Sequence, residues 1–146
     1  MTTLTIQTPD DLHLHFRDGD ILKETVAATV RSFQRAIVMP NLVPPVTTAE
    51  LALAYKSRIT DAIPKGKTFE PLMTIFLSNN TTAEDIRQAK SAGIIAAKLY
   101  PAGATTNSDA AVSALEDLSP VFEVMAEEGM LLLVHGEVTS HAIDIF

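Results

Sequence analysis

The chain has 146 residues, of which 47% are hydrophobic and 20% are charged, as is typical of a globular polypeptide of about one domain. It contains no cysteine, which excludes disulfides and thiolate metal sites, so any metal must be held by histidine, carboxylate or a modified side chain. The net charge of -7 argues against a nucleic-acid partner, and an anionic small molecule would need a locally positive pocket.

The amino terminus, MTTLTIQTPD, lacks the basic segment and apolar core of a secretory signal. No run approaches the roughly 20 apolar residues that span a bilayer. We therefore expect a cytoplasmic protein without a membrane partner. No repeat, low-complexity tract or linker divides the sequence, so residues 1–146 are expected to lie within a single domain.

Short apolar runs alternate with amphipathic helical runs, which is the pattern of βα units around a parallel sheet. Five strands are predicted, over residues 11–17, 35–40, 69–77, 94–100 and 130–135. The first helix is predicted over about residues 20–33. Capping signals place the other helix starts at Thr47 (with Glu50), Thr81 (with Glu84) and Ser119 (before Pro120), and two helix ends at Gly93 and Gly129.

The first strand, DLHLHFRD, carries polar side chains at alternate positions. Because side chains alternate across a strand, one face holds His13, His15 and Arg17, and the other, expected to meet the helices, holds Leu12, Leu14 and Phe16. Imidazoles at i and i+2 have Cβ atoms roughly 6 to 7 Å apart, a span that a metal ion can bridge. Two half-exposed histidines on an edge strand are the alternative. The His-x-His pair alone makes the metal site and the exposed pair equally good interpretations. The flanking leucines and Arg17 favour the metal site.

Three further polar residues lie where neighbouring strands end. Lys98 interrupts the apolar run AAKLYP, where burial would favour a neutral amine that acts as a nucleophile, forms a Schiff base or adds carbon dioxide to become a carbamate. His135 ends LLLVH, and Asn41 follows IVMP. Taken singly, a snorkelling lysine, a hydrogen-bonded core histidine and a turn asparagine are the favoured alternatives. Their convergence at one end of a parallel sheet nevertheless predicts a site.

Two irregular loops, NLVPPVTT and PAGATTNSDA, follow the second and fourth strands, and the second loop is expected to be mobile. At the average length of these five βα units, a barrel of eight units would have roughly 235 residues, close to the usual size of that fold. An open doubly wound sheet is the alternative, but no glycine-rich phosphate loop follows the first strand. The last residues, HAIDIF, read as the start of another helix, with His141 solvated.

The motifs HLHFRD, VMPN, PPVTT, KLYPAGATTNS and VHGE resemble, in order and spacing, those of dihydroorotases of the shorter bacterial type, in the amidohydrolase superfamily. The resemblance covers essentially the whole chain. It implies an α/β fold, a partial TIM (β/α)8 barrel comprising about the first five βα units of a metal-dependent amidohydrolase. Residues 1–146 would then be the amino-terminal part of a single barrel domain, apparently truncated.

The resemblance also implies a site with two zinc ions. His13 and His15 would hold one zinc, His135 the other, and Lys98, carboxylated on its amine, would bridge both. The implied reaction is the reversible cyclisation of N-carbamoyl-L-aspartate to (S)-dihydroorotate in pyrimidine (UMP) biosynthesis. The residues implied to bind substrate are Arg17 and Asn41, which match those that hold its carboxylate, and Thr105 and Thr106, which match a loop that closes over it.

A further metal-binding histidine, a general acid/base aspartate and a substrate-binding histidine, which the resemblance also implies, are absent from residues 1–146. We therefore expect an isolated chain with open sheet edges, poor stability and doubtful activity. Two alternatives remain: another cyclic-amide hydrolase, of the dihydropyrimidinase or allantoinase type, and a non-catalytic truncated amidohydrolase module. The sequence leaves a homodimer open.

Overall fold

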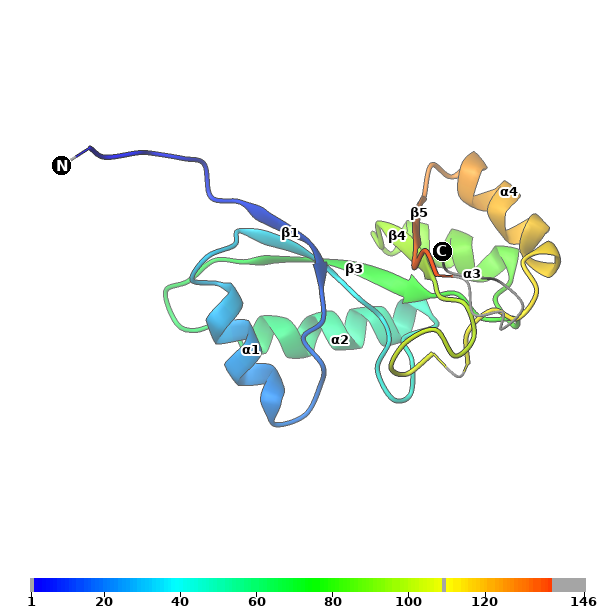
Figure 1. Cartoon of the computed structure of the whole chain (residues 1–146), viewed down its shortest axis with the longest axis horizontal. Helices are drawn as coiled ribbons and strands as arrows, with labels where there is room; N and C mark the ends of the chain where they lie inside the picture. The colour runs from blue at the N-terminus through cyan, green and yellow to red at the C-terminus, as the bar shows by residue number, and fades with distance from the viewer. Residues whose placement is uncertain (1, 109, 138–146) are drawn as a thin grey trace, which may run out of the picture.

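The computed structural model describes residues 2–108 and 110–137, and five parallel strands form its centre. They pair in chain order: β1 (Asp10–Leu14), β2 (Arg35–Val38), β3 (Glu70–Phe76), β4 (Ala96–Leu99) and β5 (Leu131–Val134). The connecting helices are α1 (Ile21–Thr29), α2 (Ala49–Asp61), α3 (Ala83–Ser91), the 3₁₀ helix η1 (Glu116–Leu118) and α4 (Ser119–Glu127). The predicted series of βα units is confirmed, and it forms a half-barrel (Figure 1).

The two faces of the sheet differ in what they bury. On one face of the sheet, every second strand residue packs with buried helix residues in the main hydrophobic cluster. The residues on this face include Phe16, Val38, Ile75, Ala97 and Leu99. The opposite face carries Phe76 and Tyr100, which form a small second cluster, and Lys98, which lies in register between Phe76 and Leu133. The helices therefore cover one face, while Lys98 projects from the other.

The strand β1 follows the predicted division of faces only in part. Phe16 is fully buried and Leu14 packs against the main cluster, but Leu12 is 66% exposed. The expectation that Leu12 packs on the helices is wrong, because β1 is an edge strand that pairs on one side only within the described residues. The other edge, β5, exposes Leu131 and Val134 in the same way. The predicted open edges are thus present in the described part of the chain.

Two helix caps lie one residue later than predicted. Thr48, not Thr47, accepts the hydrogen bond from the Leu51 backbone N–H, and the capping box of α3 joins Thr82 to Asp85. Thr81 instead accepts a hydrogen bond from the Ser78 backbone N–H and closes the turn after β3. Each pair of adjacent threonines offers two candidate caps, and the path of the incoming loop selects the second.

The remaining helix boundaries are close to those predicted. Gly93 and Gly129 follow α3 and α4 with φ values of 78° and 59°, which confirms the two helix ends. Ser119 is the first residue of α4 instead of its cap, and Leu118 precedes it. The helix α1 ends at Thr29, earlier than predicted, because the chain must turn back before β2.

The predictions for residues 141–146, a solvated His141 and the start of another helix, lie outside the described residues. Within residues 2–108 and 110–137, no helix has both the length and the apolar character required to cross a membrane.

Candidate metal and substrate site

The predicted site residues lie at or near the carboxyl ends of four of the five strands, β1, β2, β4 and β5. His13 lies within β1, and His15 and Arg17 follow its last residues. Asn41 follows β2, Lys98 lies within β4 and His135 follows β5; the His135 backbone N–H donates to the Leu99 carbonyl at 2.9 Å. Parallel strands therefore bring these side chains to one edge of the half-barrel.

His13 and His15 converge on one another. Their Nε2 atoms are 3.2 Å apart and their ring centroids 5.2 Å apart, with the planes inclined at 40°. In a neutral pair this distance allows a hydrogen bond. It is also close to the roughly 3.3 Å that separates two nitrogens bound at 2.0 to 2.1 Å to one tetrahedral zinc. The two rings are thus arranged as a metal-ligand pair would be.

The electrostatic environment favours the neutral, metal-binding form of His13. Burial is the main cause that lowers the pKa of His13. The positive charges of Lys98 and His135 lower its pKa further, and the carboxylate of Asp11 partly opposes them. A low pKa keeps the ring nitrogen free to bind a cation near neutral pH.

His15 is placed between Arg17 and Asn41. Burial lowers the pKa of His15 most, the charge of Arg17 adds to this, and the Asn41 side chain acts in the opposite direction. The His15 Nδ1 and the Asn41 Oδ1 are both buried without a hydrogen-bond partner in the described part of the chain. The Asn41 side chain is therefore close enough to affect the pKa of His15, but the two side chains do not form a hydrogen bond.

Lys98 is buried, so the snorkelling lysine that the segment AAKLYP alone favoured is not what the structure shows. Its side chain is 2% exposed, and burial lowers the pKa of its amine. The Nζ atom lies 5.1 Å from the centroid of the Tyr100 ring, a cation–π contact that offsets part of the cost of burying the charge. Among the described residues no carboxylate forms an ion pair with this amine. An amine with a lowered pKa is more readily neutral, and a neutral amine can react with carbon dioxide.

His135 already contacts a carboxylate that lies near it in the sequence. Its Nε2 contacts the Glu137 Oε2 at 2.7 Å, and its side chain is 28% exposed. Its ring centroid lies 6.0 Å from that of Tyr100, the same ring that the Lys98 amine contacts. The described residues thus bring His135 near the site, with its Nε2 engaged by a carboxylate.

Asn41 connects Arg17 to the loop after β4. Arg17 Nη1 donates to the Asn41 carbonyl at 3.4 Å, and the Asn41 Nδ2 donates to the Thr106 carbonyl at 3.0 Å. The Asn107 Nδ2 donates to the same Asn41 carbonyl at 3.1 Å. Thr105 is tied to the buried Ser108, whose hydroxyl donates to its carbonyl at 2.6 Å. Arg17, Asn41 and the threonine loop are therefore joined, and the mobility of that loop stays a prediction.

The sequence reasoning missed four residues that shape this arrangement. Asn107 and Ser108 lie inside the quoted loop motif but were not singled out, and Tyr100 shares the Lys98 face by simple alternation. Burial raises the pKa of Tyr100 to about 12, and its hydroxyl is buried without a partner among the described residues. Tyr55 gave no signal in the sequence beyond its place on the apolar face of α2.

The arrangement of His13 and His15 suits a bound cation. The full set of predicted ligands, which adds Lys98 and His135, suits it less well. The converging Nε2 atoms and the lowered pKa of His13 are what a metal-ligand pair requires. Across residues 2–108 and 110–137, however, no group of three or more histidines, aspartates or glutamates is arranged to hold a metal. Lys98 could complete such a group only as an anionic carbamate.

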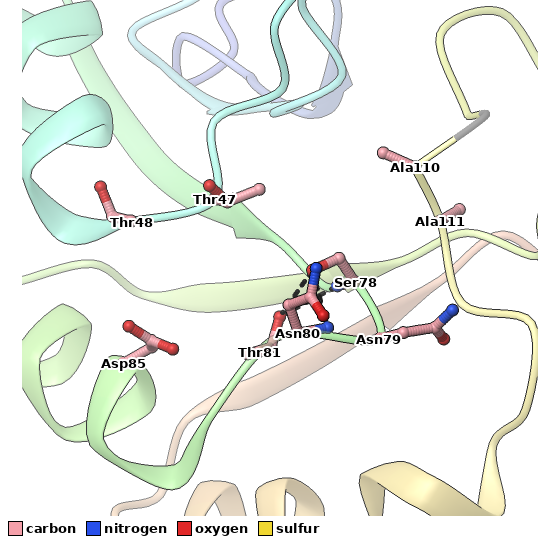
Figure 2. Close-up of a pocket in the computed structure, with 9 residues that line it drawn as sticks. All are labelled: Thr47, Thr48, Ser78, Asn79, Asn80, Thr81, Asp85, Ala110 and Ala111. Carbon is pink, nitrogen blue, oxygen red and sulfur yellow. Dashed lines mark hydrogen bonds between the residues drawn. The ribbon is translucent and has the colours of Figure 1, made fainter.

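A hollow of about 460 Å³ lies elsewhere, where α2 and α3 begin (Figure 2). It is lined by Thr47, Thr48, Ser78, Asn79, Asn80, Thr81, Asp85, Ala110 and Ala111, and by none of the predicted site residues. Several of its polar groups already serve the local structure, since Thr48 and Asp85 cap helices and Asn79 bonds to Ser113. A second hollow, of about 570 Å³, lies against Tyr100 and His135, beside the predicted site.

The βα half-barrel matches part of an amidohydrolase-type barrel. No family model matches the chain. The chain is 73% identical to the dihydroorotase of Shewanella frigidimarina over 146 residues, which are 100% of this chain and 42% of that protein. The chain is therefore similar to the amino-terminal portion of dihydroorotases and spans less than half the length of the curated relatives that it matches.

Solved structures agree with this assignment. The dihydroorotase of Campylobacter jejuni matches with a TM-score of 0.84 and 41% identity, over 97% of this chain and 44% of that one. The dihydroorotase of Saccharomyces cerevisiae, in complex with 5-fluoroorotic acid, matches with a TM-score of 0.83 and 34% identity, over 93% and 38%. The L-hydantoinase (dihydropyrimidinase) of Arthrobacter aurescens, at 21% identity and a TM-score of 0.70 over 89% and 29%, shares the fold.

Proposed function

We propose that this chain supplies the metal-binding and carboxylate-binding half of a dihydroorotase site. The proposed reaction is the reversible cyclisation of N-carbamoyl-L-aspartate to (S)-dihydroorotate in pyrimidine biosynthesis. The observation that carries the proposal is the convergence of the His13 and His15 Nε2 atoms, 3.2 Å apart, close to the buried amine of Lys98. The 73% identity to a dihydroorotase over all 146 residues supports it.

The proposed metal ligands are His13, His15, His135 and a carboxylated Lys98. Two zinc ions bound there would acidify a water molecule and polarise the carbonyl that it attacks. The Lys98 ammonium would first lose one proton; the neutral amine would then form a bond to the carbon of carbon dioxide and release a second proton, which converts a buried cation into an anion. His135 would have to leave Glu137, its present partner at 2.7 Å.

The proposed substrate contacts lie beside this metal site. Arg17 carries a guanidinium fork that suits a carboxylate, and its only recorded side-chain bond within the described residues, to the Asn41 carbonyl, is 3.4 Å long. The buried amide of Asn41 and the loop of Thr105 and Thr106 would close the same side. In a chain of net charge -7, Arg17 and the two zinc ions would provide the locally positive region that an anionic substrate needs.

The test requires a complete barrel. Residues 1–146 are joined to the remaining part of the S. frigidimarina relative, in place of its matching segment; we call this protein the chimera. We expect the chimera to bind zinc and to interconvert carbamoyl-aspartate and dihydroorotate, and Lys98→Ala to reduce turnover by roughly a thousandfold or more. Lys56→Ala, which removes an exposed lysine of α2, is the matched control and should leave turnover unchanged.

Two results would contradict the proposal. Unchanged turnover and zinc content in Lys98→Ala would remove this lysine from the metal site. Turnover of uncharged cyclic amides that survives Arg17→Ala would indicate a dihydropyrimidinase or allantoinase type of activity instead. Sedimentation of the 146-residue chain, with an activity measurement, would show whether it acts alone, as a second copy of itself, or as a non-catalytic module.

A further inference from the structure

The turn that follows β1 places Arg17 in an unusual backbone conformation. Arg17 has a φ of 65°, in the left-handed region that residues other than glycine rarely adopt. Its φ sets the direction in which the side chain leaves the backbone. A device that fixes this conformation therefore also fixes where the guanidinium points.

A buried tyrosine from α2 holds this residue by its backbone. The Tyr55 hydroxyl donates a hydrogen bond of 2.7 Å to the Arg17 carbonyl, and Tyr55 is fully buried. Burial raises the pKa of Tyr55, so its hydroxyl keeps its proton and remains a donor. The Arg17 carbonyl lies beyond Leu14, the last residue of β1 to pair with β2, and Tyr55 supplies the bond that the sheet does not.

The next residue is held by the same helix. Arg58 donates to both carboxylate oxygens of Asp18, from Nε at 3.1 Å and from Nη2 at 2.7 Å. The Arg58 guanidinium carbon lies 5.3 Å from the Tyr55 ring centroid, so the two contacts share one packed unit. Asp18 also accepts from the Gly19 backbone N–H at 3.0 Å, which fixes the turn on its far side.

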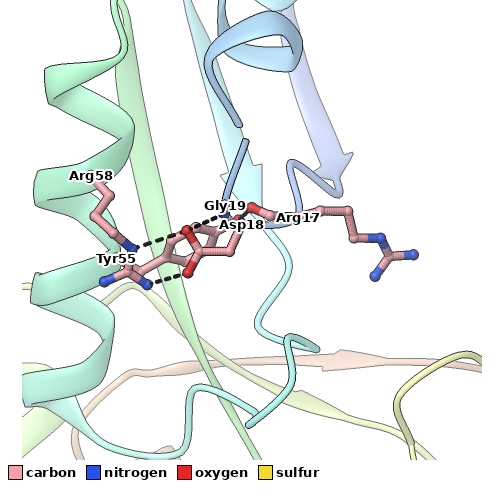
Figure 3. A network of polar contacts seen from close by, with 5 residues as sticks. All are labelled: Arg17, Asp18, Gly19, Tyr55 and Arg58. Carbon is pink, nitrogen blue, oxygen red and sulfur yellow. Dashed lines mark hydrogen bonds and ion pairs between the residues drawn. The ribbon is translucent and has the colours of Figure 1, made fainter. Parts of the chain in front are cut away.

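The side chain of Arg17 points away from this unit (Figure 3). Its guanidinium extends to the opposite side of the backbone from Tyr55 and Arg58, toward Asn41, to which it is bonded at 3.4 Å. The firm contacts thus act on the backbone of residues 17 and 18, and the guanidinium keeps its donors for another partner.

We propose that Tyr55, assisted by the Asp18–Arg58 pair, is a positioning residue that aims Arg17 at the substrate carboxylate. The inference rests on the proposed function, because Arg17 is the group assigned to that carboxylate. It adds a contact between α2 and the β1–α1 turn that acts through Arg17 without touching the substrate. Carboxylate binding by Arg17 is present in ground state and transition state alike, so its loss is expected mainly in KM.

The test uses the chimera and the variant Tyr55→Phe, which removes one oxygen and keeps the ring. We expect the KM for carbamoyl-aspartate to rise about tenfold, with kcat within about twofold, because a misaimed carboxylate ligand weakens both states equally. Arg58→Gln should raise KM about threefold, since Tyr55 remains in place. Arg35→Gln breaks a similar exposed pair, with Asp10 at the other end of β1, and should change neither constant.

Two further measurements separate positioning from simple stability. In an Arg17→Ala background, Tyr55→Phe should add less than about twofold to KM, because the group that it aims is gone. The same tenfold rise in both backgrounds would overturn the proposal. So would a lowered melting temperature with an unchanged KM.

A crystal structure of the Tyr55→Phe chimera gives an answer that does not depend on turnover. The proposal expects Arg17 to leave its positive φ and its guanidinium to move; an unmoved Arg17 would overturn it. A wild-type chimera that turns over neither carbamoyl-aspartate nor dihydroorotate would instead overturn the proposed function, while the conformation of Arg17 would still decide the positioning role.

Discussion

The carboxyl ends of β1 and β5 both carry predicted metal ligands, but the protein holds them very differently. At β1, His15 is half-buried and the turn that follows is fixed by Tyr55 and Arg58 from α2. At β5, Val134 is 54% exposed and His135 is turned onto the exposed Glu137. Both are edge strands within the described residues, so the difference lies in the side chains that bond to each turn and not in strand pairing.

This comparison teaches where a half-barrel can preorganise a site. Side chains from a neighbouring helix can fix the turn at a strand's carboxyl end, even when one edge of that strand is unpaired. No such helix lies among the described residues after β5, and His135 takes the partner nearest in sequence. A group at the open side thus depends on the part of the barrel that closes over it.

The largest expected effect comes from covering the β5 edge. We expect the chimera to exceed the 146-residue chain in dihydroorotase turnover by roughly a thousandfold or more, because His135 gains neighbours and further ligands enter the site. The chain alone should self-associate through its exposed edges, as sedimentation would show. Equal turnover per site in a monomeric chain would break the comparison.

Phe16 precedes Arg17 and Val134 precedes His135, and replacing each by alanine should lower the stability of the fold by different amounts. In the 146-residue chain, Phe16→Ala should lower the free energy of unfolding by about 3 to 5 kcal/mol, because its ring is fully buried. Val134→Ala should lower it by less than about 0.5 kcal/mol, since that side chain is half-exposed. Urea unfolding measures both, and in the chimera the Val134 loss should rise to about 1 kcal/mol as the new strand covers it.

Lys98 lies between the two regions, and its burial is expected to oppose stability. In the zinc-free chimera, Lys98→Met should raise the free energy of unfolding by about 1 kcal/mol, because it removes a buried amine while keeping much of its volume. Thermal unfolding in the presence of a chelator measures the change. Lys56→Met, at an exposed position, should leave stability within about 0.5 kcal/mol, and a fall in stability for Lys98→Met would show that its contacts outweigh its burial.

The smallest expected effect concerns acid sensitivity at the β1 turn. Burial of Asp18 pushes its pKa up, but the hydrogen bonds from Arg58 and from the Gly19 N–H outweigh this, so the pKa lies below its ordinary value of 3.8. A carboxylate with a lowered pKa stabilises the fold above the unfolded value, and this contribution is lost as pH falls below 3.8 through the folded value.

The matching experiment compares wild type with Asp18→Asn. The stability difference, below about 1 kcal/mol because the pair is partly exposed, should be present at neutral pH and vanish in acid. Asp10→Asn, which breaks the pair with Arg35, serves as the control: it should share the acid dependence without changing KM. A difference that persists unchanged in acid would show that Asp18 acts through packing and not through its charge.

Much of the fold could be predicted because its signals are local. The alternation of strand and helix patterns predicted the five βα units, and the glycines after α3 and α4 predicted two helix ends. The errors arose where two local choices were equivalent, as at the paired threonines Thr47–Thr48 and Thr81–Thr82. The exposure of Leu12 could not be predicted, because alternation identifies a face but does not reveal whether a neighbour covers it.

The sequence by itself determined which chemistry the chain can offer. The period of two in a strand places His13, His15 and Arg17 on one face, and the apolar run around Lys98 places an amine within a strand that is otherwise apolar. Such constraints act over a few residues and can be read directly from residue order.

Only the tertiary structure decided how those groups are held. The 3.2 Å approach of the histidines depends on rotamers, and the docking of the loop onto Asn41 depends on contacts between distant segments. The bond from Tyr55 to the Arg17 carbonyl joins residues 38 positions apart. Such contacts follow from how α2 packs against β3 and reaches the turn after β1, which no local pattern in either segment specifies.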